Sequence, residues 1–229
     1  MINIGVEHCA SFVSSQFKPG VGRAGAVRRA VTISRQAGSG AAVVAGKLAH
    51  FLQKQTPEDD QPWEVYDSNL IDKMLADHGL PPYLAKVLKE DRVSQLEDFM
   101  VDALGVHPPS ATLLQHLTET LLQLAGNGNV ILIGRGGNMV TSKLPHVLHV
   151  RLVAPLEKRI QHCAETLHMT HDQAAKFCPA EDHARQRYFK KYFNTDIDNP
   201  LLYHVIINTG QVGYDEAARI IGDAVLKLD

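Results

Sequence analysis

The sequence predicts an α/β fold with a mostly parallel, five-stranded sheet. Five short apolar runs, typical of strands, alternate with amphipathic segments typical of helices, and this alternation favours parallel strands joined by right-handed crossovers. The run at 130–133 (VILI) is apolar at every position, as in a strand that is buried on both faces. A chain of 229 residues fits one such domain with an inserted or lid segment, or two small domains.

Each expected element follows from its residue pattern and the breaks beside it. Strands are expected at 31–33, 63–66, 130–133, 147–153 and 205–208. Helices are expected from 41 to 52, 68 to 79, 110 to 125, from 155 onwards, from 170 to 193 and from 215 to 228, with a polar helical arm at 83–104. Residues 1–29 include a stretch rich in glycine and basic residues and are expected to form a flexible leader. A solvated linker and an anion-binding role for Arg23, Arg28 and Arg29 both stay open there.

Composition excludes several classes of protein. The net charge of −2 does not support a general nucleic-acid or membrane-surface role, and no apolar run approaches the ~20 residues of a membrane span. Three cysteines without metal-site spacing, and no secretory signal order at the amino terminus, favour the cytoplasm. The twelve histidines match no metal-binding spacing, so no metal ligand is predicted.

The segment from 30 to 52 is the first candidate site. A strand followed by the glycine turn 38–40 and then a helix directs free backbone N–H groups at an anion. A full phosphate loop reads GxxxxGK[ST], but Ala41 and Ala42 stand where the lysine and the hydroxyl belong. The pair Gly46-Lys47 lies inside the helix and does not replace them. Taken alone, the turn is as typical of close packing as of a phosphate site.

Two further charged residues come where expected strands end. Asp67 follows the second strand, where a carboxylate could accept a hydrogen bond from an acceptor hydroxyl, or could only cap the next helix. Arg135 lies between glycines after the third strand, and a guanidinium in that position favours bidentate phosphate recognition. Because ligands bind at the carboxyl ends of parallel strands, these groups are expected to converge on the glycine turn.

Several phrases together resemble the cytidylate kinase-like family, a branch of the P-loop nucleoside-monophosphate kinases. They are VTISRQAGSG from Val31, VYDSNLIDKM from Val65, VILIGRGGN from Val130, LPHVLHVRLVAPLEKRI from Leu144, AEDHARQRYFKKYF from Ala180 and NPLLYHVIINTG from Asn199. The resemblance covers 30–228 and implies a P-loop NTPase-type three-layer sandwich with a helical lid at about 165–195. It also implies a role for each candidate residue: phosphate binding by Arg35, Gly38, Ser39, Gly40, Ala41 and Ala42; acceptor binding by Asp67 and Arg135; a position beside the donor base for Arg159; and catalysis by the lid residues Asp182, Arg185 and Arg187.

The activity implied is phosphate transfer from ATP to a nucleoside monophosphate or another small acceptor, with Mg²⁺ inferred from the donor. No nucleic-acid or membrane partner is expected, and a homodimer stays open. The chain departs from the family at Ala41 and Ala42, and at Gly136, where true cytidylate kinases carry an acidic residue. These losses favour the alternative of a catalytically degenerate nucleotide-binding regulatory module, and a structural α/β protein whose turn binds nothing is a third interpretation.

Local alternatives also remain. Arg159 could simply pair with a carboxylate such as Glu157, and Asp182 could pair with Arg185 three residues later on one helix face. The aromatic residues at 188–193 could stack on a base, although this spacing more often anchors a helix to the core.

Overall fold

The sheet contains five strands in the order β2-β3-β1-β4-β5. The computed structural model describes residues 28–57, 60–67 and 110–228. The strands are β1 (Ala30–Arg35), β2 (Glu64–Tyr66), β3 (Val130–Ile133), β4 (Val147–Val153) and β5 (Val205–Asn208). Every neighbouring pair in this sheet is parallel, which confirms the predicted sheet.

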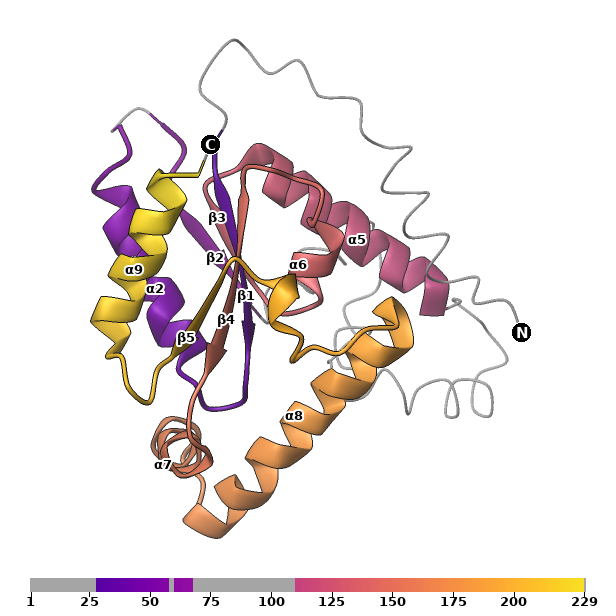
Figure 1. The fold of residues 1–229 in the computed structure, drawn as a ribbon, viewed down its shortest axis with the longest axis vertical. Coiled ribbons are helices and arrows are strands. Elements are labelled where there is room, and N and C mark those ends of the chain that lie inside the picture. The colour runs from indigo at the N-terminus through magenta and orange to yellow at the C-terminus, as the bar shows by residue number, and fades with distance from the viewer. Residues whose placement is uncertain (1–27, 58–59, 68–109, 229) are drawn as a thin grey trace.

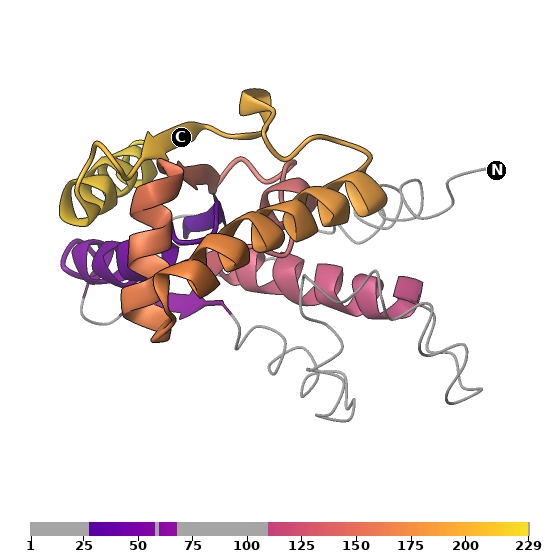
Figure 2. The same ribbon diagram turned by 90° about the horizontal axis from the view of Figure 1, so that it is seen from below.

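Helices cover both faces of the sheet and make three layers (Figure 1). Helices α2 (Ala41–Gln53) and α9 (Tyr214–Leu226) lie side by side on one face. The other face carries α5 (Ser110–Asn127) and the short α6 (Gly137–Val140). Figure 2 shows α7 (Leu156–Leu167) and α8 (His171–Phe193) crossing in front of the carboxyl ends of the strands. The one-turn 3₁₀ helix η2 (Pro200–Leu202) precedes β5.

Apolar periodicity explains how these elements are held. In α2, the predicted inward positions Val44, Leu48 and Leu52 are fully buried against the sheet. Residues of β3 point alternately into the two layers, which is why an all-apolar run forms this strand. In the described part of the chain, no helix has the length and apolar character that a membrane crossing requires.

Helix α8 is anchored at both ends. Thr170 and Gln173 form a reciprocal capping box at its start. Near its end, Tyr188 and Phe189 are buried in an aromatic cluster with Tyr192 and Phe193. The packing confirms that these aromatic residues anchor the helix rather than stand free for a base.

Some sequence expectations need adjustment. The sequence did not predict α6, because its four residues (GNMV) are too few to show a helical period. The helices expected at 68–79 and 83–104 lie outside the described residues, as does most of the expected leader. Its last two residues belong to the folded body: Arg28 pairs with Asp60 at 2.7 Å, and Arg29 donates to the Leu228 carbonyl at 3.0 and 3.1 Å.

Candidate active site

The glycine turn after β1 has the backbone geometry of an anion-binding loop. Gly38 and Gly40 have φ angles of 76° and 79°, in the left-handed region that favours glycine. Gly40 is the N-cap of α2 and has no side chain that could accept hydrogen bonds from the first N–H groups of the helix. These N–H groups can therefore donate to a ligand. Ala41 and Ala42 begin the helix without a cation or a hydroxyl, as the sequence indicated.

Residues of α7 and α9 pack closely against this loop. A Cβ atom at Gly38 would lie 2.3 Å from the backbone oxygen of Arg159, and one at Gly40 would lie 2.4 Å from the ring of Tyr214. The hydroxyl of the loop residue Ser39 donates to the Gln36 carbonyl at 2.8 Å. The loop is therefore a tightly supported element in which no larger residue would fit at either glycine.

Arg159 and Asp182 join this loop to helices α7 and α8. The guanidinium of Arg159 is buried and donates to the backbone oxygens of Ala154 at 2.9 Å and Ala37 at 3.1 Å. It also contacts Asp182 Oδ2 at 2.6 Å. The other carboxylate oxygen of Asp182 accepts the backbone N–H of Ala37 at 2.7 Å. Arg159 thus pairs with Asp182 rather than with Glu157, which contacts His171 at 2.9 Å.

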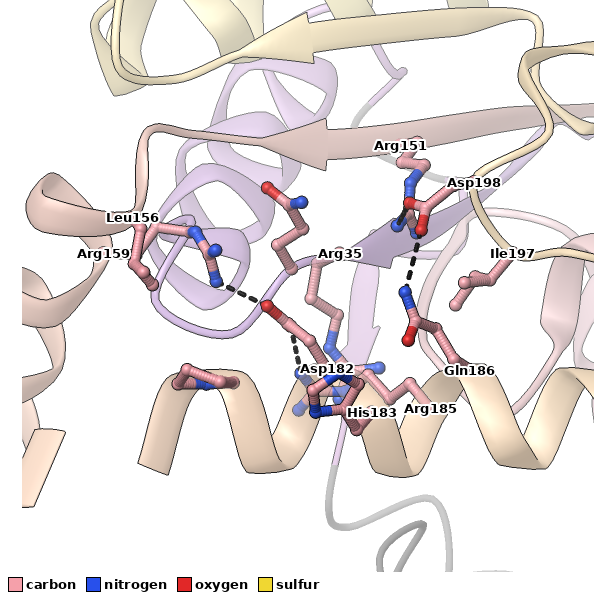
Figure 3. A pocket seen from close by; sticks show the side chains of 12 residues that line it. Arg35, Arg151, Leu156, Arg159, Asp182, His183, Arg185, Gln186, Ile197 and Asp198 are labelled. Atoms are coloured by element: carbon pink, nitrogen blue, oxygen red, sulfur yellow. Dashed lines mark hydrogen bonds and ion pairs between the residues drawn. The ribbon is translucent and has the colours of Figure 1, made fainter. Parts of the chain in front are cut away.

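A pocket of about 220 Å³ opens between the loop and α8 (Figure 3). Four arginines and two aspartates line it, and guanidinium groups are donors that suit the binding of a phosphate group. These residues are Arg35, Arg151, Arg159, Arg185, Asp182 and Asp198. They come from β1, β4, α7, α8 and the segment before η2, so the fold assembles the pocket from distant parts of the chain.

The structure brings most of the predicted lid and loop residues together. Arg185 contacts Glu181 at 2.8 Å and lies 3.6 Å from Asp182 Oδ1, which confirms the expected pairing one helix turn apart. Arg35 lies 3.7 Å from Asp67, so the second strand end does reach the loop region. Arg187 is exposed on α8 and does not line the pocket.

Arg135 does not line this pocket, but the glycines on either side of it line a smaller cavity that shares Arg35 and Arg185 with the pocket. Arg135 is buried with a φ of 58°, unusual for a residue other than glycine, between Gly134 and Gly136 that are also left-handed. Tyr188 of α8 donates to its backbone oxygen at 3.4 Å. A small cavity of about 10 Å³ opens beside this turn, and the buried amide nitrogen of Asn138, which lines it, has no protein acceptor among the described atoms. Buried donors normally have a partner, so this amide suits a water molecule or a ligand oxygen.

Sequence reasoning missed Arg151, which lies on β4. It is 4% exposed, donates to Ser34 Oγ at 2.9 Å and pairs with Asp198, whose other oxygen accepts from Gln186 of α8 at 3.1 Å. The guanidinium also lies over the ring of Tyr203, and burial raises the pKa of that tyrosine. The signal was present as a single arginine inside the otherwise strand-like run VLHVRLV.

The described residues form no cluster of three or more histidine, cysteine or acidic side chains that could hold a metal ion. Cys163 and Cys178 are buried with their sulfur atoms 3.4 Å apart, and burial raises the pKa of Cys178 to about 12. A thiol whose pKa is raised in this way is a poor nucleophile. The arginines of the pocket and the N–H groups of the loop suit the binding and charge stabilisation of an anion.

Comparison with known proteins agrees with this geometry. A model of the cytidylate kinase-like family matches residues 30–211. A uronate isomerase of Corynebacterium glutamicum is 23% identical over 168 residues, which are 71% of this chain and 32% of that protein. A cytidylate kinase of Staphylothermus marinus is 25% identical over 101 residues, 44% of this chain and 56% of that protein. The chain therefore spans about a third and somewhat over half of the lengths of these two curated relatives.

Two solved structures share the fold. An uncharacterized protein from Eubacterium ventriosum superposes with a TM-score of 0.64 at 16% identity, over 87% of this chain and 99% of its own. A shikimate kinase from Bacteroides thetaiotaomicron superposes with a TM-score of 0.51 at 10% identity, over 86% of this chain and 98% of its own. At these identities the likeness shows a common three-layer α/β architecture.

Proposed function

Because this chain belongs to the cytidylate kinase-like family, we propose that it is a kinase that transfers phosphate from ATP to a nucleoside monophosphate or another small acceptor. The observation that carries the proposal is the pocket of about 220 Å³, with its four arginines, beside the glycine loop. Phosphoryl transfer needs little covalent chemistry from the protein and depends on positioning and charge stabilisation. A loop that presents N–H groups and a pocket lined by four arginines supply both.

Each residue then has a distinct task. The N–H groups at the start of α2, after Gly40, hold the donor phosphates. Arg35 and Arg185, which line the pocket, supply the charge that a lysine at position 41 gives in the standard loop. Asp67 and Arg135 bind the acceptor, and Arg187, exposed on α8, joins the site when the lid moves onto the substrates.

Arg159 has a different task from the one that the family resemblance implied. Its three contacts, with Ala154, Ala37 and Asp182, engage the Nε and Nη1 atoms of the guanidinium. We therefore propose that Arg159 positions the loop, although its guanidinium also forms part of the pocket wall.

Magnesium is expected to enter with the nucleotide. Mg²⁺ is commonly held by one or two carboxylates together with substrate phosphates and water. Ala42 offers no hydroxyl ligand. Asp67, directly after β2, offers a carboxylate that could hold the ion. The ion would neutralise charge on the phosphates, and Arg35 and Arg185 would act on the remaining charge.

A turnover assay tests this function. ADP production from ATP and Mg²⁺ is measured with a panel of nucleoside monophosphates and small hydroxyl acceptors, for the wild type, Arg185→Ala and the control Lys190→Ala. Lys190 is an exposed cation of the same helix that does not line the pocket. Loss of one preorganised charge contact in a transition state typically costs about 10²–10³ in rate, so Arg185→Ala should lose about that factor while Lys190→Ala keeps the wild-type rate. Equal rates for all three proteins would refute the role of Arg185.

The specific observation that favours a second function is the pair Ala41-Ala42 at the helix start. A regulatory module would bind nucleotide without turning it over. Calorimetric binding of ATP, with and without Mg²⁺, in the absence of turnover with every acceptor would favour this module over the kinase. Absence of nucleotide binding would refute both.

A further inference from the structure

The contact between Asp182 and the phosphate loop has a consequence for ligand binding. The Oδ1 atom of Asp182 accepts the N–H of Ala37, the loop residue directly before Gly38, at 2.7 Å. The same carboxylate contacts Arg159 at 2.6 Å and lies 3.6 Å from Arg185. A backbone N–H with two guanidinium groups is the set of donors that recognises a phosphate oxygen. Here these donors contact a carboxylate of the protein's own helix α8.

We infer that Asp182 is an internal competitor for phosphate, so that helix α8 partly occludes the anion site until a ligand displaces this carboxylate. The inference rests on the proposed function only in taking the glycine loop as a phosphate site, and it adds a means of regulating that site. It applies equally to a catalytic kinase and to a non-catalytic nucleotide-binding module.

The position of the carboxylate makes displacement feasible. Asp182 lines the pocket of about 220 Å³, and its side chain is 19% exposed, so a solvent-borne anion can reach it (Figure 3). A phosphate oxygen hydrogen-bonded to the Ala37 N–H would stand within contact distance of Asp182 Oδ1, and two like charges at that distance repel strongly. The two anions therefore exclude each other at this N–H.

The change in anion affinity depends on the fraction of molecules in which Asp182 contacts the loop. When only a fraction of molecules has the site open, the apparent Kd rises by the inverse of that fraction. If the Asp182 contact leaves about one molecule in ten open, removal of the carboxylate tightens anion binding about tenfold. A purely structural role predicts the opposite sign, because a loosened loop binds less well.

The test uses inorganic tripolyphosphate, which probes the loop without a base or an acceptor. Its Kd is measured by calorimetry for the full chain and for Asp182→Asn, Asp182→Ala and Glu181→Gln. Glu181 is the matched control, because it is the adjacent acid on α8 and contacts Arg185 at 2.8 Å. We expect both Asp182 variants to bind about tenfold more tightly than the wild type, and Glu181→Gln to change the Kd less than threefold.

Three results would overturn the inference: Asp182 variants that bind as weakly as the wild type or more weakly, a Glu181→Gln variant that gains as much, or no tripolyphosphate binding by any protein. If both Asp182 variants fail to fold, hydrogen exchange on the wild type decides. Tripolyphosphate should speed exchange of the amides around 181–186 as the contact opens, and unchanged or slower exchange there on binding would contradict it.

Turnover separates this inference from the proposed kinase. Wild-type turnover with no tightening in the Asp182 variants would reject the internal competitor and leave the kinase. Tightening without turnover on any acceptor would reject the kinase and leave the internal competitor.

Discussion

Replacement of Arg159 by alanine should cost this protein a large part of its stability. The side chain is 8% exposed and makes three contacts through its guanidinium: to Ala154 O at 2.9 Å, to Ala37 O at 3.1 Å and to Asp182 at 2.6 Å. Removal of one partner of a buried ion pair typically costs about 3–5 kcal/mol, because the other charge stays buried. Asp182 is 19% exposed and keeps its bond to the Ala37 N–H, which places the loss nearer about 3 kcal/mol.

Urea denaturation measures this loss. With a slope of about 2 kcal/mol per M, a loss of about 3 kcal/mol lowers the midpoint by about 1.5 M at unchanged slope. Arg159→Lys should lose about half as much, because an ammonium keeps the charge but cannot span three acceptors in a plane. Arg219→Ala is the matched control: it removes an arginine that is 66% exposed and contacts Glu216 at 3.4 Å, and such pairs contribute about 0–1 kcal/mol.

The reasoning fails if Arg159→Ala loses less than about 1 kcal/mol or no more than Arg219→Ala. Either result would mean that the contacts between the loop, α7 and α8 do not contribute to the folded state as the geometry indicates.

Three further predictions concern other parts of the molecule. Burial lowers the pKa of His149 to about 4, so the unfolded chain binds more protons than the folded protein between pH 6.5 and 4. The unfolding free energy should therefore fall by up to about 3 kcal/mol as the pH is lowered from 6.5 to 4. Denaturation curves at several pH values should show a weaker pH dependence for His149→Asn than for the wild type. Gly40→Ala puts a Cβ at a φ of 79° and 2.4 Å from Tyr214, so it should cost more than about 1 kcal/mol and weaken tripolyphosphate binding, whereas an unchanged melting temperature would contradict the loop geometry. Tyr203→Phe removes a buried hydroxyl that donates to Ile197 O at 2.7 Å, and a loss of about 1–2 kcal/mol in urea melts is expected, with no loss arguing against that bond.

The sequence alone predicted all five strands of the sheet. Strands β3, β4 and β5 have the predicted bounds, because each is a short apolar or alternating run closed by glycine, proline or a polar turn. The glycine turn was also readable, since a strand followed by GSG and an amphipathic helix leaves few backbone conformations available.

Only the tertiary structure decided which charged groups from distant parts of the chain meet. Arg159 pairs with Asp182, 23 residues later, because α7 and α8 pack on each other, while the nearer Glu157 contacts His171 instead. Arg151 becomes a pocket residue because β4 neighbours β1 in the sheet and brings its guanidinium to Ser34. Such partners depend on how distant elements cross, which local residue patterns do not encode. For this reason the loop could be predicted from sequence, but the carboxylate that occupies it could not.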